Sequence, residues 1–574
     1  MKIIVAKTAG FCMGVKRAVE MVLDATNRNE FPIYTYGPLI HNTQVLELLE
    51  ERGVSILNSV PTNGGGTILI RAHGVPPKIK ESLNKGGFKL IDATCPRVIK
   101  VQQIISRHAR DGYASIIVGD KDHPEVVGLL GYAGNMGYVV ENIEELKQLK
   151  IFDKAIIVAQ TTQNTLLFEE ITNIVKNNFP YYKVFNTICD STQRRQDEVK
   201  VLSKSVDTVV VVGGLNSGNT QRLFEIAKLE GKPVYHIETE YDLNMEIFGK
   251  TKSIGITAGA STPNWIINKI YKNIELSIFK DKKNLRRLFF LLQQFVLRTN
   301  LYVAFGAGAL CYTCTKLSYI NSYFSNVLIA MLYVLSMHIL NNLIGRKSDK
   351  YNDPDRANFY EKNKFILTFF GFISGSIGLF VAYKTGFTSF LILLVMSVMG
   401  FLYNIKIIPL NLSYHQKIKD IPGSKTILIA LAWGVVTSIL PSIAQLKIIN
   451  LTTFVVFMWS TILVFIRTSL FDLMDMQGDR IVGKETIPIL LGEKKTIRFL
   501  KTLLLGLTFI LLLSSILKIT SNIGFLTIFS PIFTFIILSI LETGYIPPGI
   551  KMEFLIDLQF LLLGAITFLF YFYG

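Results

Sequence analysis

The pattern of hydrophobic and polar positions divides the chain into two parts. Up to about residue 274, short β-branched runs alternate with glycine-rich turns and with segments whose apolar residues recur at helical spacing. This alternation is typical of a soluble α/β fold. Beyond residue 288 the chain becomes a succession of long apolar stretches separated by short basic loops. The second part is therefore predicted to be an all-α polytopic membrane domain.

The apolar stretches are long enough, or nearly so, to cross a hydrocarbon layer of about 30 Å. We place about nine transmembrane helices, at roughly 289–315, 323–343, 363–383, 387–404, 425–445, 451–471, 497–517, 521–541 and 553–573. Because the fourth stretch is short, a count of eight is the alternative.

The basic residues of the second part lie mainly in every other loop. They cluster before the first stretch and after the second, fourth and sixth. Because positive charge is retained on the cytoplasmic side, we expect these loops and the soluble part to share the cytoplasmic face of the cytoplasmic (inner) membrane. The formal net charge of +17 then reflects topology, and no nucleic-acid partner is expected. No cleavable signal peptide is predicted at the start.

Three cysteines of the first part share one local pattern. Cys12, Cys95 and Cys189 each stand between a short apolar strand and the start of a helix, and their spacing suggests a threefold internal repeat. A helix start offers unpaired amide donors and partial positive charge, which favours thiolates and an anionic metal–sulfur centre. The pattern predicts that they hold one iron–sulfur cluster. The alternative is three buried free cysteines, and disulfides are not expected in a reducing compartment.

Polar residues recur at the ends of other strands in the first part. They occur in the segments GPLIHN, RAHG, DHPEVVG, QTT, GGLNSGNT and TAGAS, and the candidates are His41, His73, His123, Glu125, Thr161, Ser217, Asn219 and Ser261. Ligands bind at strand ends in open α/β sheets, and this donor-rich set suits a diphosphate. In a closed cavity, Glu125 could relay a proton. Each residue taken alone is equally consistent with an ordinary turn.

Together these motifs resemble the LytB/IspH family, the 4-hydroxy-3-methylbut-2-enyl diphosphate reductases of the non-mevalonate isoprenoid pathway. The matching segments follow the family order and include GFCMGVKRA, RAHGV, DATCP, HPEVVG, TICDSTQRRQ, NSGNT and TAGASTP. The resemblance covers roughly residues 1–275. It implies an α/β trefoil of three pseudo-symmetric α/β modules around a central 4Fe-4S cluster, in which one iron has no protein ligand.

The resemblance also implies roles for individual residues. The cluster ligands are Cys12, Cys95 and Cys189, and Glu125 supplies the proton. The substrate pocket is lined by His41, His73, His123, Thr161, Ser217, Gly218, Asn219 and Ser261. Gly218 stands where the family often has serine, so only its backbone could contribute. The implied reaction removes the substrate hydroxyl with two electrons and two protons, yielding isopentenyl and dimethylallyl diphosphates, with an external ferredoxin or flavodoxin as electron donor.

The second part resembles the UbiA prenyltransferase superfamily over roughly residues 285–574. Asp472, Asp475 and Asp479, followed by Lys484, match its Asp-rich motif, and residues 403–409 match its signature after the fourth span. The resemblance implies a site for Mg²⁺ and an allylic diphosphate at the membrane boundary. The first family motif, Asn-x3-Asp-x3-Asp, here places Gly345 between Asn341 and Asp349.

Gly345 removes one expected metal ligand. Asp353 and Asp355 are near enough in sequence to compensate for it. We divide the chain into a reductase-like domain at 1–278, a basic linker at 279–288 and a UbiA-like domain at 289–574. The favoured interpretation is a bifunctional isoprenoid enzyme in the lipid bilayer. The alternatives are a reductase whose degenerate UbiA-like half is a membrane anchor, and a non-enzymatic iron–sulfur redox sensor.

Overall fold

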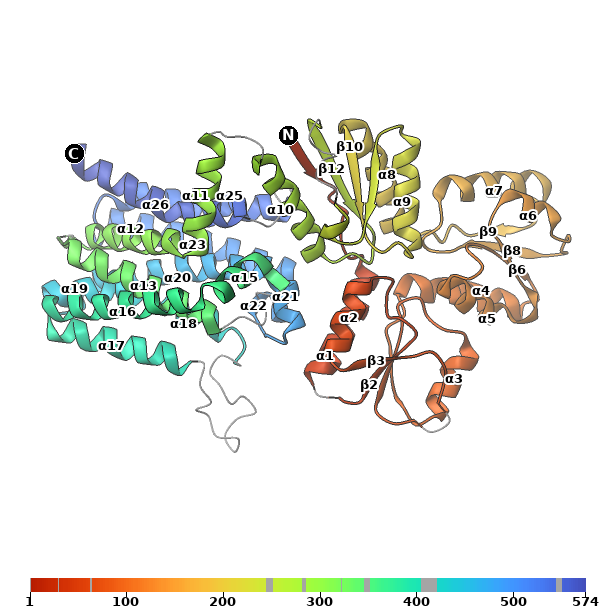
Figure 1. The fold of residues 1–574 in the computed structure, drawn as a ribbon, viewed down its shortest axis with the longest axis horizontal. Coiled ribbons are helices and arrows are strands. Elements are labelled where there is room, and N and C mark those ends of the chain that lie inside the picture. Colours follow the sequence, from red (N-terminus) through yellow and green to blue (C-terminus); the bar gives the residue numbers. More distant parts are fainter. Residues whose placement is uncertain are drawn as a thin grey trace. The chain divides into compact units, whose positions relative to one another are not determined.

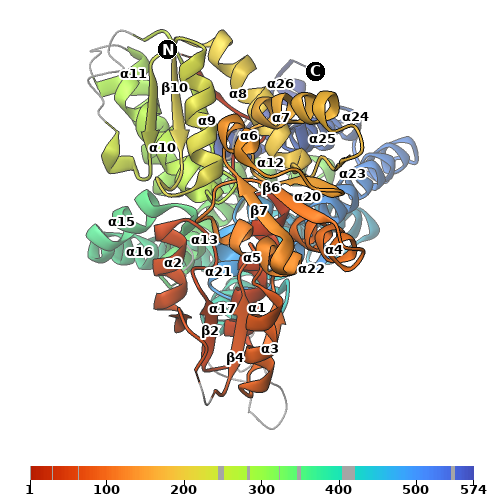
Figure 2. The ribbon, with the colours of Figure 1, turned by 90° about the vertical axis from the view of Figure 1, so that its right-hand side faces the viewer.

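The computed structural model, shown in Figure 1 and Figure 2, describes most of the chain. The described residues are 2–28, 30–61, 64–243, 251–280, 285–321, 323–344, 351–403, 421–543 and 550–573. They divide into two units, Met1–Asp281 and Lys282–Gly574. The first unit combines parallel sheets with helices, and the second is helical.

The first unit contains three modules, each built on a four-stranded parallel sheet. The first module has β2 (Ile33–Tyr36), β3 (Val54–Leu57), β4 (Thr67–Ile70) and β5 (Lys89–Asp92). The second has β6 (Ala114–Val118), β7 (Gly137–Val140), β8 (Ala155–Ala159) and β9 (Lys183–Val184). The third has β10 (Thr208–Val212), β11 (Val234–Ile237), β12 (Ser253–Ala258) and β1 (Lys2–Val5).

All three sheets have the same strand order. Across each sheet the order is β3-β2-β4-β5, β7-β6-β8-β9 and β11-β10-β12-β1. The third module reaches this order only because the first strand of the chain pairs with β12. The predicted α/β architecture of three similar modules is confirmed.

The central strands are buried on both faces. The segments of β6, β8 and β10 are rich in valine and isoleucine and are buried at every position. Separate apolar clusters lie on the two faces of the sheets in the second and third modules. Continuous apolar strands of this kind are characteristic of parallel sheets covered by helices on both sides.

The helices of the first unit connect the strands and the modules. They are α1 (Met13–Asn27), α2 (Thr43–Glu51), α3 (Pro77–Lys85), α4 (Pro96–Arg110), α5 (Pro124–Ala133), α6 (Ile143–Gln148), α7 (Thr165–Asn178), α8 (Asp190–Ser205), α9 (Gly218–Leu229) and α10 (Asn264–Lys280), with short 3-10 turns at Gly134–Met136 and Glu240–Asp242. The helix after each fourth strand leads into the next module, since α4 packs on α5 and β6, and α8 packs on α9 and β10.

The second unit is a helical bundle with a common apolar core. Its helices are α11 (Leu285–Arg298), α12 (Leu301–Leu317), α13 (Phe324–Ile344), α15 (Pro354–Lys362), α16 (Lys364–Thr385), α17 (Phe387–Leu402), α18 (Ser424–Gly434), α19 (Leu440–Leu446), α20 (Leu451–Met474), α21 (Met476–Ile481), α22 (Ile487–Leu491), α23 (Glu493–Ile516), α24 (Gly524–Thr527), α25 (Phe529–Thr543) and α26 (Ile550–Tyr573), with a π-helical segment at Val435–Ile439. The core includes Trp433, Trp459, Leu463 and Phe560.

The prediction of about nine spans is not confirmed. Within the described residues, seven helices are long and apolar enough to cross a membrane. An eighth candidate is a pair of helices, Leu288–Arg298 and Leu301–Leu317, that meet at 74°. Asn300 breaks the first predicted stretch by adopting a left-handed conformation with φ of 60°. The fourth predicted stretch forms α17, whose 16 residues fall short of a span.

Helix α11, which precedes the bend, is amphipathic. Its outer face exposes Leu288, Phe289, Leu291, Leu292 and Phe295. The opposite face buries Phe290, Gln294 and Leu297 against the bundle. Helix α11 is therefore an amphipathic helix that precedes α12. Its apolar content alone could not show that α11 and α12 do not form one straight transmembrane helix.

A buried ion pair joins α20 to α26 inside the bundle. Arg467 Nε lies 2.7 Å from Asp557 Oδ1, and Arg467 Nη2 donates to Asp557 Oδ2 at 2.9 Å. The two side chains are only 6% and 2% exposed. The guanidinium also lies 4.4 Å from the ring centroid of Phe471. Because neither charge reaches water, each depends on the other.

We predict that Asp557→Ala destabilises the second unit by about 3–5 kcal/mol, because it leaves a buried guanidinium without its partner. Replacing both residues, by Arg467→Met with Asp557→Leu, should recover most of this loss. Glu542→Ala, which removes the partner of Lys501 from an exposed pair, should change stability little. Thermal and denaturant unfolding of the full chain in detergent would measure these effects, and equal losses in Asp557→Ala and Glu542→Ala would contradict the prediction.

Candidate active site

The polar residues of the first unit lie at three repeated positions, each beyond the carboxyl end of a strand. Within each module the strands are counted in the order in which they were introduced above. The first strands (β2, β6, β10) are followed by His41, His123 and Ser217, and the third strands (β4, β8, β12) by His73, Thr161 and Ser261. The fourth strands (β5, β9, β1) are followed by Cys95, Cys189 and Cys12. All nine line one cavity, together with Glu125, Gly218 and Asn219. Because ligands bind at the carboxyl ends of parallel strands, this cavity is the candidate site.

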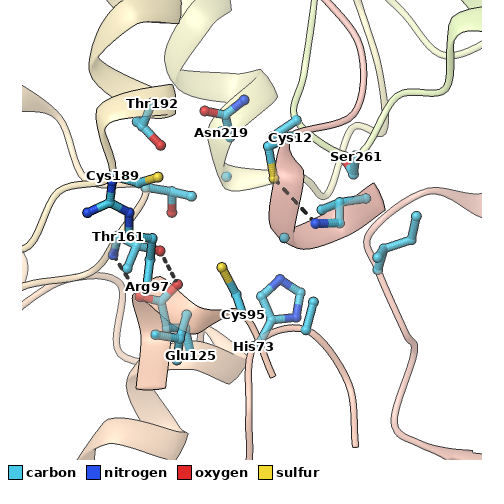
Figure 3. A pocket seen from close by; sticks show the side chains of 18 of the residues that line it. Cys12, His73, Cys95, Arg97, Glu125, Thr161, Cys189, Thr192, Asn219 and Ser261 are labelled. Atoms are coloured by element: carbon cyan, nitrogen blue, oxygen red, sulfur yellow. Dashed lines mark hydrogen bonds between the residues drawn. The ribbon is translucent and has the colours of Figure 1, made fainter. Parts of the chain in front are cut away.

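The three cysteines occupy equivalent positions at helix starts. Cys12, Cys95 and Cys189 are the N-cap residues of α1, α4 and α8. Figure 3 shows their sulfur atoms directed into the same space. Cys12 Sγ accepts a hydrogen bond from the amide of Val15 at 3.4 Å. Three half-buried thiols on three helix N-termini therefore converge, as the sequence predicted.

The electrostatics of the cysteines suit a metal–sulfur group. Burial raises the pKa of the Cys95 thiol; amide donors from Arg97 and Val98 oppose this rise, and the neighbouring Cys12 and Cys189 add to it. A side chain at Gly14 would place its Cβ 2.5 Å from Cys95 Sγ, so any larger residue here would displace that sulfur. The donor set and the space beside it fit an iron–sulfur cluster held by cysteine thiolates.

The three histidines form a second cluster in the same cavity. Their ring centroids are 4.9 Å (His41–His73), 5.7 Å (His41–His123) and 5.3 Å (His73–His123) apart. Burial lowers the pKa of all three, for His123 to about 4. At neutral pH each ring is therefore uncharged and offers one N–H donor. Nε2 of His41 and Nδ1 of His73 are buried without a hydrogen-bond partner among the described residues.

Further unpaired polar groups lie around the histidines. Neither side-chain atom of Asn219 has a hydrogen-bond partner within the described parts of the chain, although both atoms are buried. Ser261 Oγ donates to the His41 carbonyl at 3.0 Å and lies 3.4 Å from Ser217 Oγ. Helix α9 begins at Gly218 with no side-chain cap, which leaves amide donors directed at the cavity.

This set of donors is suited to an anion with several oxygens. The histidine nitrogens lie within 4.8 Å of one another and could also hold a metal ion. The side-chain amide of Asn219, which has no partner among the described residues, and the N-terminus of α9 favour the anion, because both offer hydrogen-bond donors.

Glu125 is buried at the edge of the cavity and is 1% exposed. Its Oε1 accepts a hydrogen bond from the Thr161 amide at 2.7 Å, and its Oε2 accepts one from Thr161 Oγ1 at 2.8 Å (Figure 3). Burial raises the Glu125 pKa to about 7, although the Thr161 hydrogen bonds oppose the rise. Near neutral pH the carboxyl can therefore both hold and release a proton.

Sequence reasoning missed several residues of this cavity. Gly14, Arg97 and Thr192 line it. Gly14 and Arg97 each follow a predicted cysteine by two residues, so their closeness to these cysteines could have identified them as cavity residues. Thr192 gave no such signal, because a threonine in the first turn of a helix is common.

The Asp-rich segment of the second unit is largely buried. Asp472 and Asp479 are each 2% exposed. Asp472 accepts a hydrogen bond from Thr426 at 2.5 Å. Asp479 Oδ1 lies 3.2 Å from Lys484 Nζ and 3.4 Å from the amide nitrogen of Asn352. Asp475 directly follows α20. The three carboxylates thus lie on α20, α21 and their junction, with a cation beside them.

The other predicted acidic residues lie elsewhere. Asp353 caps α15 and lies 3.6 Å from Arg356, while Asp355 lies 3.7 Å from Arg298. Asn352, rather than either of them, contacts Asp479. Asn341 lies near the end of α13. Gly345, Asp349 and residues 404–409 lie outside the described residues.

Comparison with known proteins identifies both halves. The family model described as LytB protein matches residues 3–275, and that of the UbiA prenyltransferase family matches residues 301–545. The 4-hydroxy-3-methylbut-2-enyl diphosphate reductase of Aquifex aeolicus is 44% identical over 276 residues, which are 48% of this chain and 96% of the relative. The reductase of Geobacter sulfurreducens is 44% identical over 286 residues, covering 49% and 99% of the two chains.

Solved structures give similar matches. The Plasmodium falciparum reductase structure is 30% identical, with a TM-score of 0.46, over 48% of this chain and 87% of that one. A UbiA homolog from Aeropyrum pernix is 11% identical, with a TM-score of 0.37, over 47% and 98%. By the family model and the reductase relatives, the chain belongs in its first half to the LytB family of 4-hydroxy-3-methylbut-2-enyl diphosphate reductases, and its second half matches the UbiA prenyltransferase family model at residues 301–545.

Proposed function

We propose that the first half reduces 4-hydroxy-3-methylbut-2-enyl diphosphate to isopentenyl and dimethylallyl diphosphates. The observation that carries this proposal is the single cavity that combines three cysteines, a set of neutral anion-binding donors and a buried carboxyl group. In the overall reaction the C–OH bond breaks, two electrons and two protons are consumed, and the products are a C–H bond and water.

Cys12, Cys95 and Cys189 would hold a 4Fe-4S cluster. When bound, this group supplies electrons one at a time and a Lewis-acidic iron that no cysteine ligates. The electrons would come from an external ferredoxin or flavodoxin. In each module the cysteine follows the strand at one edge of the sheet, and β3, β7 or β11 forms the other edge. The neighbouring third strand is followed by His73, Thr161 or Ser261.

The diphosphate would be held by the histidines, Asn219, Ser217, Ser261 and the N-terminus of α9. The uncharged histidines can donate N–H bonds to phosphate oxygens, and Asn219 gains the partner that it otherwise lacks. Fixing this end of the substrate orients the hydroxyl-bearing carbon, which is the main contribution that binding energy makes to such a reaction.

Glu125 and Thr161 would deliver the proton. When Glu125 is protonated, the 2.8 Å contact to Thr161 Oγ1 can reverse its polarity, so that the carboxyl donates and the hydroxyl passes a proton towards the cavity. A carboxyl with a pKa of about 7 can be protonated again between turnovers.

For the second half, we propose Mg²⁺-dependent binding of an allylic diphosphate at Asp472, Asp475 and Asp479, followed by prenyl transfer. The alternative, a membrane anchor without transferase activity, is favoured by Gly345 at a ligand position. We also propose that residues 279–288 link a cytoplasmic reductase domain at 1–278 to a multi-pass domain at 289–574 in the cytoplasmic membrane.

The decisive experiment is anaerobic turnover of the full chain in detergent, with a reduced viologen as electron donor and both C5 diphosphates quantified. Glu125→Gln should keep the cluster spectrum and lose activity by about 10²-fold or more, because proton transfer commonly contributes that much. The unmodified chain should lose rate as pH rises through about 7, where Glu125 loses its proton. Thr161→Val removes both the relay hydroxyl and a hydrogen bond that favours the Glu125 carboxylate, so the rate should fall, and the loss of the remaining activity with rising pH should occur at higher pH. Full turnover by Glu125→Gln would refute the proton role.

Two glycines of the cavity provide a matched test of the cluster site. Gly14→Ala should abolish cluster binding as completely as Cys95→Ser, because the new methyl group overlaps Cys95 Sγ. Gly218→Ala should keep the cluster, since the nearest atoms to its Cβ are 3.7 and 3.9 Å away. Iron and acid-labile sulfide content and the visible absorption spectrum would measure this. A normal cluster in Gly14→Ala would contradict the assigned site.

For the membrane half, inorganic diphosphate should raise the apparent Tm of the full chain further when Mg²⁺ is present, because the carboxylates need a cation to bind an anion, whereas binding in the cavity of the first half needs none. Asp475→Asn should remove the Mg²⁺-dependent part of the shift. Asp355→Asn, whose carboxylate faces Arg298, is the matched control and should keep it. If no part of the shift depends on Mg²⁺ in the unmodified chain, the anchor interpretation holds instead.

A further inference from the structure

Three arginines join the cysteine loops of different modules to one another. Arg17 of α1, the helix that follows Cys12, donates from Nη1 to the carbonyl of Thr94 at 3.1 Å. Thr94 directly precedes Cys95. Arg97, in the first turn of α4, forms an ion pair with Asp190, which directly follows Cys189. The loop of Cys12 is thus tied to that of Cys95, and that of Cys95 to that of Cys189.

The third arginine closes the ring. Arg195 of α8, the helix that follows Cys189, donates from Nη1 to the carbonyl of Thr8 and from Nη2 to that of Gly10 at 2.7 Å. Both carbonyls belong to the loop that leads to Cys12. Glu198 of the same helix reinforces the contact by accepting hydrogen bonds from the amides of Lys7 and Thr8 at 2.7 and 2.8 Å.

One arginine of the ring, Arg195, is buried beside the cysteines. It is 4% exposed. Burial lowers the pKa of the guanidinium, and the nearby thiols of Cys12 and Cys189 oppose this lowering. Helix N-termini usually attract acids, but α1 and α4 have no acidic residue in the first turn, and the one in the first turn of α8, Asp190, is paired with Arg97. Cationic side chains at these N-termini are favourable when the cavity holds an anionic group, so the departure from the usual pattern points to the cysteine site.

We propose that Arg17, Arg97 and Arg195 are positioning residues that form a ring of clasps between the modules and hold the three cysteine loops at cluster-binding spacing before the cluster is inserted. The inference rests on the proposed function, because the iron–sulfur cluster is the group for which the loops are positioned. Among the described residues, the three arginines form no hydrogen bond with the substrate donors or with one another, so they act through the loops.

The exposed pair of Arg97 and Asp190 allows a test that does not threaten folding. Arg97→Gln should lose its cluster to a chelator about tenfold faster than the unmodified chain, as is common when a partner of a metal ligand is removed. The swap of Arg97→Asp with Asp190→Arg restores the link and should restore slow loss. Arg110→Gln, on the same helix with its guanidinium bonded to Ser106, is the matched control and should behave like the unmodified chain.

A second measurement uses the apoprotein, where no cluster holds the loops. The two remaining cysteines of the chain, Cys311 and Cys314, are buried in α12 and are replaced by alanine (Cys311→Ala and Cys314→Ala). In this full chain, a short bifunctional thiol reagent should cross-link Cys12, Cys95 and Cys189 in pairs. Arg97→Gln and Arg195→Lys should lower the yield, and the swap should recover it. A general loss of stability would instead appear as a lower apparent Tm without rescue by the swap.

The results separate the clasps from the reductase assignment. Equal cluster loss and equal cross-linking in Arg97→Gln, the swap and Arg110→Gln would overturn the clasp proposal, even if the enzyme is active. An unmodified chain that binds no cluster would overturn the proposed function, and the cross-linking yields would still report whether the arginines hold the loops together.

Discussion

The parallel pairing of β1 with β12 is the contact on which the whole site depends. It places Val5 opposite Ile256 and so brings the loop of Cys12 to the third module, beside strands that lie more than two hundred residues later in the sequence. Without this pairing the third module would lack its fourth strand, and only two cysteines would stand at equivalent edges. A site made from three modules therefore requires that the first strand of the chain complete the last sheet.

The repeated architecture supplies equivalent positions, and the substitutions at those positions supply the chemistry. The cysteine position is the same in all three modules, as a shared inorganic group would require. The position two residues beyond the first-strand residue differs: it is Thr43 after His41, Glu125 after His123 and Asn219 after Ser217. Glu125 is a buried acid, and Asn219 is an amide without a hydrogen-bond partner among the described residues, so the roles proposed for this one position are proton transfer in one module and anion binding in another. An asymmetric substrate can thus be bound by a nearly symmetric frame.

Local features of the first half were predictable because each rests on neighbouring residues. The strand, cysteine and helix pattern identified Cys12, Cys95 and Cys189, and the turn motifs identified the histidines. The pairing of β1 with β12 and the contact of Arg195 with Gly10 could not be predicted, because they join residues far apart in sequence. In the second half, the length of the apolar stretches predicted the helices. It could not show that the first stretch bends at Asn300, because one residue hardly changes the mean hydropathy of a long stretch.

The two halves offer opposite electrostatic surroundings to the diphosphate groups that we propose they bind. In the cavity of the first unit, the donors are uncharged imidazoles, an amide, hydroxyls and a helix N-terminus, and the one carboxyl, Glu125, has a pKa raised towards neutrality by burial. Such a site attracts an anion without a metal ion. In the second unit, Asp472 and Asp479 are buried carboxylates that would repel a diphosphate unless cations stand between them. Lys484 beside Asp479 neutralises only part of that charge. Under the proposed function, the cavity of the first unit therefore needs no metal ion to bind the diphosphate, whereas the Asp-rich site of the second unit would attract the same group only once divalent cations are bound.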